Sequence, residues 1–145
     1  MSILHRANDV TLAVIGVLEA AGLLVGDAVK PAGGGWAGAV GDSAFTPYVV
    51  VYNLVGGSTG GTLEHSDSDA SPTYQFTSTG ANRAQTEMVA DAARAAILTA
   101  AIELPGRKVA LCTIDMLGGA TRDDDEQPPV WWSPDRYRLV IVPAP

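Results

Sequence analysis

The sequence predicts an α+β fold, in which a mostly antiparallel sheet of about four strands carries two packed helices. Two segments predict the centre of the sheet. Pro47–Leu54 is apolar almost throughout, and Thr73–Thr79 alternates, with Tyr74 and Phe76 on one face. The third observation is an alanine-rich stretch after Gly80, whose apolar residues recur at the spacing of one helix face.

The start of the chain has the apolar spacing of a helix. Asn8 or Asp9 is a suitable N-cap, and Gly22 is suited to end the helix after about Ala21. The apolar segment Leu23–Val29 then predicts a short strand, because it is too short for a second helix.

The middle of the chain combines glycine-rich loops with strands. Ala32–Thr46 predicts a long loop or a hairpin anchored by Trp36, and the sequence assigns this segment no role. Tyr48–Leu54 is apolar on both faces, so we expect a central strand that is covered on both sides. Gly56–Pro72 predicts a long polar loop.

The main helix is expected from Asn82 to about Ile102, because Asn82 and Gln85 have the spacing of a capping box. An inner apolar stripe and a solvated charged face follow from helical periodicity. The stripe holds Val89, Ala93, Ala96, Ile97 and Ala100, and the solvated face holds Arg83, Glu87, Asp91 and Arg94.

Two further strands are expected near the end of the chain, at Arg107–Met116 and Arg136–Val142, with an acidic loop at Leu117–Pro129 between them. Strict alternation divides their side chains between two faces. Val109, Leu111 and Thr113 would oppose Ala110, Cys112 and Ile114, and Tyr137, Leu139 and Ile141 would share one face.

Length and composition predict a single domain covering residues 1–145, with a formal net charge of −7 that argues against a general nucleic-acid binder. The single cysteine, Cys112, excludes an intrachain disulfide and a cysteine zinc site. Val10–Val25 is short for a membrane span, and the N-terminus lacks a signal-peptide pattern. We therefore expect a soluble protein without a membrane partner.

Gly56–Gly60 matches the G-x-S-x-G pattern of a hydrolase nucleophile, with Ser58 at its centre. That chemistry requires a sharp strand-to-helix turn and a histidine placed later in the fold. The only histidine after Ser58 is His65, in the same expected loop, so a flexible loop is the favoured interpretation. Phosphate-loop and dinucleotide patterns are missing too, and we expect no catalytic residue and no cofactor.

Two acidic clusters have the composition of cation sites. Glu64, His65, Asp67 and Asp69 form one, and Asp123–Glu126 forms the other. Neither has the order of a calcium loop, with its central glycine and closing glutamate. Solvated acidic turns are the favoured interpretation, and we expect no metal site.

Trp131 and Trp132 are the main candidates for anchoring a partner. Adjacent side chains of an extended chain point to opposite sides. One tryptophan can therefore enter the core while the other contacts a partner, because aromatic anchors are typical of interfaces. The alternative is that both pack inside this chain.

The central segment resembles a known family in the order of its motifs. These are Pro47–Tyr52, Gly61–Leu63 after a glycine-rich spacer, Tyr74–Gly80 after an acidic stretch, and Asn82–Arg94. Together they resemble the tail terminator proteins of long-tailed, siphovirus-type bacteriophages, particularly those that infect actinobacteria. The resemblance covers roughly Pro47–Leu98.

This resemblance implies a small, non-enzymatic virion subunit, usually six to a ring, located at the junction of tail and neck. The ring would sit on the head-proximal end of the tail tube, stop its polymerisation and join the head connector. Its partners would be other copies of itself, the tail tube protein and a head-completion or connector protein. DNA would pass through the lumen without specific binding.

Within that picture, we expect one acidic loop to line the lumen and the other to contact adjacent rings. The candidate residues are Glu64, Asp67 and Asp69 in the first loop and Asp123, Asp124 and Asp125 in the second. We also expect the isolated protein to be monomeric or weakly associated. Three alternatives stay open: another neck component, such as a head-completion or stopper protein; a small serine hydrolase using Ser58; and a host-cell-binding module.

Overall fold

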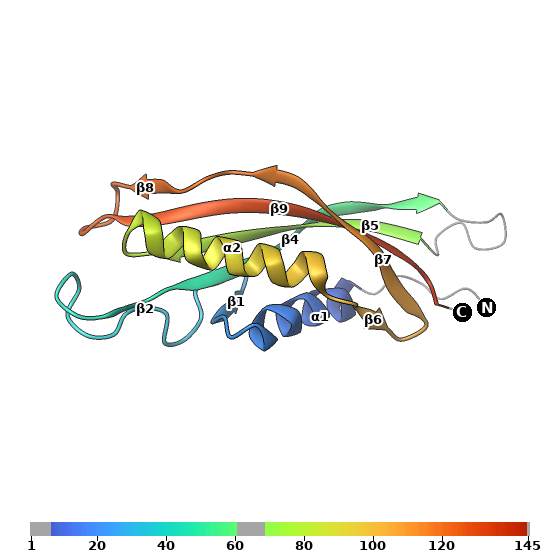
Figure 1. Cartoon of the computed structure of the whole chain (residues 1–145), viewed down its shortest axis with the longest axis horizontal. Coiled ribbons are helices and arrows are strands. Elements are labelled where there is room, and N and C mark those ends of the chain that lie inside the picture. Colours follow the sequence, from blue (N-terminus) through green and yellow to red (C-terminus); the bar gives the residue numbers. More distant parts are fainter. Residues whose placement is uncertain (1–6, 61–68, 145) are drawn as a thin grey trace.

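A computed structural model describes residues 7–60 and 69–144, which form a seven-stranded sheet, two helices and a separate two-stranded ribbon (Figure 1). The helices are α1 (Ala7–Ala20) and α2 (Arg83–Thr99). The sheet has the strand order β1 (Val25–Asp27), β4 (Tyr48–Gly60), β5 (Asp69–Gly80), β9 (Val130–Pro143), β7 (Arg107–Leu117) and β6 (Glu103–Leu104), and β8 (Thr121–Asp123) also pairs with β9. The ribbon pairs β2 (Gly35–Trp36) with β3 (Phe45–Thr46).

The expected sheet of about four antiparallel strands is wrong in both number and direction. The four long strands β4, β5, β9 and β7 correspond to expected segments and pair antiparallel. Three short strands complete the sheet, and β1 runs parallel to β4. Of these three, only β1 was expected, because β6 and β8 are too short to carry a periodic pattern. The result is a mixed, curled sheet (Figure 1).

Both helices pack on the same face of the sheet, and the core lies between helices and strands. Its helical residues recur every fourth position, which is the spacing of one helix face. They are Val10, Val14 and Leu18 in α1 and Val89, Ala93 and Ile97 in α2; the strands add Val49, Val51, Tyr74, Phe76, Tyr137, Leu139 and Ile141. The expected inner stripe of α2 and the inward faces of β5 and β9 are thereby confirmed.

The first helix is tied to the sheet by a buried hydrogen bond between the hydroxyl groups of Thr11 and Tyr74, 2.8 Å apart. It ends as expected at Gly22, whose φ of 86° is favourable only for glycine. The N–H groups of Gly22 and Leu23 donate to carbonyls of the last turn, as in a Schellman motif. Neither helix in the described residues is long and apolar enough to cross a bilayer.

The second helix begins with the expected cap. The Asn82 side chain accepts a hydrogen bond from the Gln85 N–H at 2.8 Å, and the Gln85 side chain accepts one from the Ala81 N–H at 2.8 Å. The Thr86 hydroxyl then donates to the Trp131 carbonyl at 3.2 Å. The cap closes the first turn of α2, and the Thr86 hydrogen bond attaches that turn to β9.

The expected division of side chains along β7 is wrong, because the strand contains two β-bulges. Ala110 and Asp115 are extra residues, since the pairing with β9 shifts by one position at each of them. Val109 and Cys112 therefore both pack against the core, while Leu111 between them is 55% exposed. Burial raises the pKa of the Cys112 thiol to about 11.

Two expected loops contain more strand than their composition indicated. β4 continues to Gly60 and β5 begins at Asp69, so much of Gly56–Pro72 belongs to a long hairpin. Within Leu117–Pro129, the short strand β8 pairs with β9. Cross-strand pairing explains both differences, because glycine-rich and acidic sequences have low strand propensity of their own.

The glycine-rich segment Ala32–Thr46 contains a hairpin, which was one of the two expected possibilities. Trp36 anchors it by an edge-to-face contact with Phe45, with ring centroids 5.1 Å apart. The helix-free face of the sheet is only partly covered: Val50 is buried, but Tyr52 is 37% exposed. The expectation that Tyr48–Leu54 is covered on both faces is therefore wrong for its second half.

Gly118 follows the end of β7, where there is no room for a side chain. A Cβ atom there would lie 2.3 Å from the backbone oxygen of Pro134. We expect Gly118→Ala to lower the free energy of unfolding by about 2–3 kcal/mol, because the backbone has to move. Urea unfolding followed by circular dichroism measures this change.

The matched control is Gly16→Ala in α1, where an added Cβ has no neighbour within 4 Å. Alanine is the better helix former, so this variant should gain about 0.5–1 kcal/mol. Equal effects of the two substitutions would contradict the close approach at Gly118.

Candidate interaction surface

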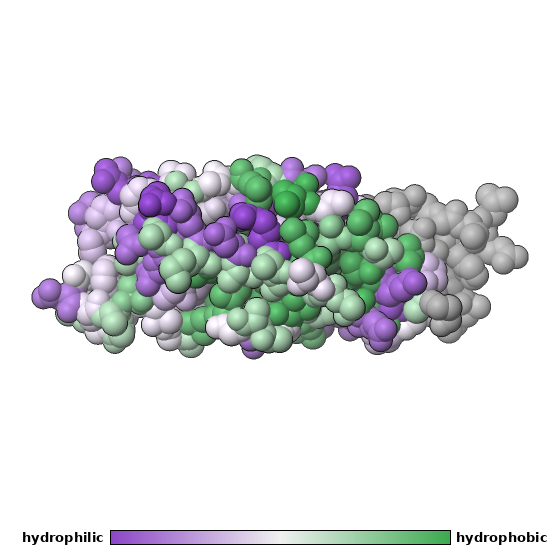
Figure 2. Space-filling view, in the orientation of Figure 1, coloured by the Kyte–Doolittle hydropathy of each residue, from purple (hydrophilic) through white to green (hydrophobic). Residues whose placement is uncertain are grey.

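A groove of about 330 Å³ runs between α2 and the junction of β7 with β8. The helix lines one side with mostly charged residues. Small and apolar residues at the junction of β7 and β8 line the other side, and β9 adds two polar ones. The lining residues are Glu87, Ala90, Asp91 and Arg94 from α2, Leu117, Gly119 and Ala120 from the end of β7 and the segment before β8, and Ser133 and Asp135 from β9. Figure 2 shows this contrast as hydrophilic atoms over α2 beside a hydrophobic patch over β7.

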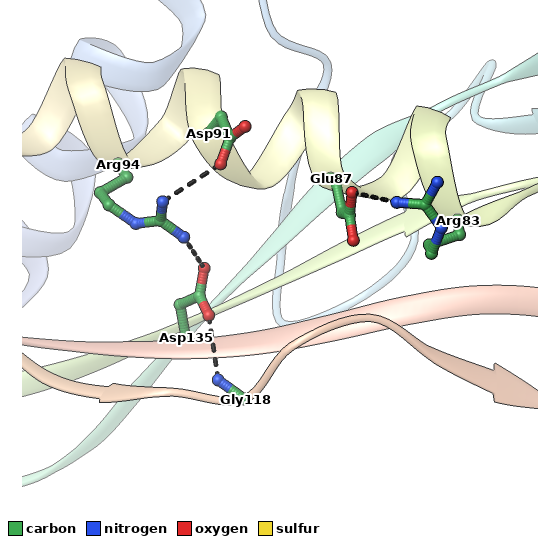
Figure 3. Close-up of polar contacts among 6 residues, drawn as sticks. All are labelled: Arg83, Glu87, Asp91, Arg94, Gly118 and Asp135. Atoms are coloured by element: carbon green, nitrogen blue, oxygen red, sulfur yellow. Dashed lines mark hydrogen bonds and ion pairs between the residues drawn. The ribbon is translucent and has the colours of Figure 1, made fainter.

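Asp135 on the floor of the groove is the one buried acidic side chain among the residues whose burial is described. Its carboxylate lies 3.4 Å from the guanidinium of Arg94 and accepts a hydrogen bond from the Gly118 N–H at 3.2 Å (Figure 3). Arg94 also contacts the exposed Asp91 at 3.1 Å. The expectation that Arg94 belongs to the solvated face of the helix is therefore wrong, because its side chain is only 29% exposed and pairs with a buried acid.

Burial dominates the electrostatics of this floor. It raises the pKa of the Asp135 carboxyl, and the Gly118 N–H and the Arg94 guanidinium act in the opposite direction. Burial, followed by the charge of Asp135, also raises the pKa of Tyr137 to about 12, against the lowering influence of Arg94. Arg94 is thus the cation that limits the cost of keeping a carboxylate out of water.

The strand side of the groove continues into exposed apolar surface on β7. Leu117 is 50% exposed and lines the groove, and Ile114 is 45% exposed on the same face of the strand. On the opposite face, Leu111 is 55% exposed. Exposed apolar side chains gathered on one strand are typical of surfaces that contact another protein.

The acidic candidates of the second loop lie beside β8. Asp123 ends this strand, and its side chain accepts a hydrogen bond from the Asp125 N–H at 3.0 Å. Asp124 forms an ion pair with Arg122, with 2.6 Å between the Arg122 Nε and an Asp124 carboxylate oxygen. The arrangement is a turn closed by its own side chains.

The other acidic candidates lie elsewhere. Asp69 begins β5, at the opposite end of the molecule from β8 (Figure 1). Glu64, His65 and Asp67 lie outside the described residues. Among the residues whose side chains are described, 7–54 and 71–144, no three histidine, cysteine or acidic side chains are grouped as a metal site requires.

Trp131 and Trp132 both belong to β9, where they pair with Arg122 and Thr121 of β8. Their side chains therefore point to opposite faces of the sheet. Trp132 is 37% exposed, and Trp131 is partly buried. An anchoring role for Trp132 stays a prediction.

The backbone of Ser58 lies inside β4, paired with Ala70 of β5. A nucleophile elbow places its serine on a sharp turn between a strand and a helix. The strand position of Ser58 does not provide that turn, and the polypeptide that follows it returns as another strand.

Sequence reasoning missed the pair of Arg94 and Asp135, although one signal was present. Asp135, Tyr137, Leu139 and Ile141 alternate along one strand, so a carboxylate occupies a register position that points to the core. A buried acid requires a cation or hydrogen-bond donors, and this requirement would have directed the search to the arginines of α2.

We expect Arg94→Met to destabilise the protein by about 2 kcal/mol at pH 7.5, because it leaves the buried Asp135 carboxylate without its cation. The loss should shrink as the pH falls towards 4. Folding raises the pKa of the Asp135 carboxyl above its unfolded value, which is near 3.9. Stability is therefore lost as the pH rises from the pKa of the unfolded state through that of the folded state. The substitution raises the pKa of the folded state further, so its cost is largest above both values.

Thermal or urea unfolding of both proteins across this pH range measures the difference. The control is Arg83→Met, because Arg83 pairs with Glu87 on the exposed side of the same helix (Figure 3). It should change stability by less than about 0.5 kcal/mol at either pH. A loss in Arg94→Met that does not depend on pH would contradict the role of Asp135.

The sequence matches no family model and no curated protein. Its fold is similar to that of a chain in the solved structure of the virion of a native gene transfer agent (GTA) particle, with a TM-score of 0.61 and 19% sequence identity. The similarity covers 93% of this chain and 96% of that one. At this level of identity the finding concerns the fold, which the two chains share over nearly their whole lengths.

Proposed function

We propose that this protein is a structural component of a phage-like virion. The observation that carries the proposal is the shared fold with a chain of a gene transfer agent virion, which covers 93% of this chain and 96% of that chain at a TM-score of 0.61. The match spans nearly the whole of both chains, so it is not limited to one common motif. The exposed apolar side chains of β7 also support a role in assembly.

Within the particle, we propose that the chain acts as the tail terminator. In that role a ring of subunits, usually six, ends the polymerisation of the tail tube at its head-proximal end and joins the tail to the head connector. The motif order along Pro47–Leu98 supports this role, since it resembles that of tail terminators. The long hairpin β4–β5, with α2 packed behind it, forms that part of the chain.

The acidic residues at the two ends of the sheet are the proposed contacts with DNA or neighbouring rings. Asp123, Asp124 and Asp125 lie beside β8, and Asp69 lies at the far end of the hairpin. Carboxylates that face the lumen would repel DNA and let it slide past. If the long axis of each subunit crosses the ring wall, one acidic end faces the lumen and the other faces the outside of the ring.

Co-sedimentation with isolated tail tubes and with DNA-filled heads tests the proposed role. We expect the protein to pellet with tubes, and negative-stain images to show added density at one end of each tube only. Tubes that already carry their natural terminator are the control and should bind no additional protein. Binding to heads alone would contradict the terminator role and would favour a head-completion or stopper protein.

A further inference from the structure

Both sides of the sheet end in strand edges that are open over most of their length. β6 pairs only with the first residues of β7, Arg107 and Lys108. The next N–H, that of Val109, donates to the carbonyl of Ile102, just before β6. On the other side, β1 covers β4 only from Val49 to Val51. Within the described residues, no further strand pairs with either edge.

Open edges present unpaired backbone N–H and C=O groups, so stable proteins protect them with charge, proline or a covering segment. The open part of β7 has little of this protection. Leu111 and Ile114 are exposed, and the one charged residue, Asp115, lies 3.4 Å from Arg138 of the neighbouring strand β9. The bulges at Ala110 and Asp115 leave Leu111–Ile114 between them as a regular stretch that can pair.

The two open edges are complementary in direction. β4, β5, β9 and β7 are joined by three successive antiparallel pairings, so β4 and β7 run in opposite directions. A copy placed beside the sheet by rotation about an axis along the strands would therefore bring its β7 antiparallel to β4. The regular stretch of β4 beyond β1 is Tyr52–Leu54, before the first shift in its pairing with β5.

Side chains at these stretches also match. Tyr52 of β4 and Leu111 of β7 both lie on the helix-free face, where they are 37% and 55% exposed. A rotated copy keeps its helix-free face on the same side. The strand pairings place Thr113 level with Leu54, through Arg138 and Thr73, so these two residues become cross-strand neighbours on that face. Such cross-strand pairs contribute to sheet stability.

We propose that copies of this chain join edge to edge, with Leu111–Ile114 of β7 in one subunit pairing antiparallel with Tyr52–Leu54 of β4 in the next. This contact is heterologous, so each subunit keeps one free edge of each kind until the assembly closes. A closed assembly continues the sheet from subunit to subunit. Its closure into a ring rests on the proposed terminator function, whereas the pairing itself rests on the two edges.

Two variants block one edge each. Leu111→Lys/Thr113→Lys places two lysines on β7, and Tyr52→Lys/Asn53→Lys places two on β4, all at exposed positions. Lysine is the residue that natural edges use against pairing. Because both variants gain the same charge, a mixture cannot associate by new attraction between them. Circular dichroism confirms folding, and the single substitutions Leu111→Lys and Asn53→Lys replace any double variant that does not fold.

The control variant places two lysines on the helices. Leu12→Lys/Met88→Lys changes side chains that are 56% and 71% exposed in α1 and α2. Sedimentation velocity up to about 1 mM protein covers weak association between isolated chains. We expect the unmodified protein and the control to associate equally, and each edge variant alone to associate at least tenfold more weakly.

Mixing the two edge variants gives the decisive result. Each contributes its one intact edge, so we expect a one-to-one heterodimer that does not grow further. A β7 variant or a β4 variant that still self-associates alone would overturn the proposal in favour of a symmetric dimer. A mixture that stays monomeric, or an unmodified protein that does not associate at about 1 mM, would also overturn it.

Binding to tail tubes separates this inference from the proposed function. Edge variants that cap tube ends as well as the unmodified protein would overturn the edge pairing and leave the terminator role intact. Unmodified protein that pairs through its edges but does not bind tubes would overturn the terminator role and leave the pairing intact.

Discussion

The buried carboxylate of Asp135 is the contact on which the arrangement of helix and sheet depends. It lies 3.4 Å from Arg94 of α2 and accepts a hydrogen bond from Gly118, so one side chain connects the helix, β9 and the end of β7. Burying a charge costs several kcal/mol, and pairing offsets only part of this cost. The pair therefore acts by fixing the position of α2 on the sheet, because a shift of the helix would leave the carboxylate unpaired.

This constraint accounts for the one-sided architecture. With α2 held over β5 and β9, and α1 tied to β5 by the contact between Thr11 and Tyr74, all helical mass lies on one face of the sheet. The other face and both long edges are left for contacts outside the chain. In the groove beside α2, Arg94 pairs with both Asp91 and Asp135.

Open edges and a rigid helical layer suit a subunit that has to join identical neighbours. Sheet edges supply a ladder of backbone hydrogen bonds that is independent of most side chains. The helices cover one face of the sheet, and Asp69 begins β5 at the opposite end of the molecule from β8. These features agree with the proposed role as a subunit of a larger assembly.

The sequence by itself determined the long elements, because their signals are local. Each signal depends only on residues a few positions away. This holds for the cap at Asn82, the alternation of Tyr74 and Phe76, and the apolar stripe of α2. Tertiary structure alone decided the bulges of β7, the strands β6 and β8, and the burial of Arg94. A bulge exists only relative to its partner strand, and Arg94 finds its acid 41 positions further along the chain. The alternation of β9 marks Asp135 as core-facing, but a contact at that distance has no periodic signal, so only the folded chain shows which arginine pairs with it.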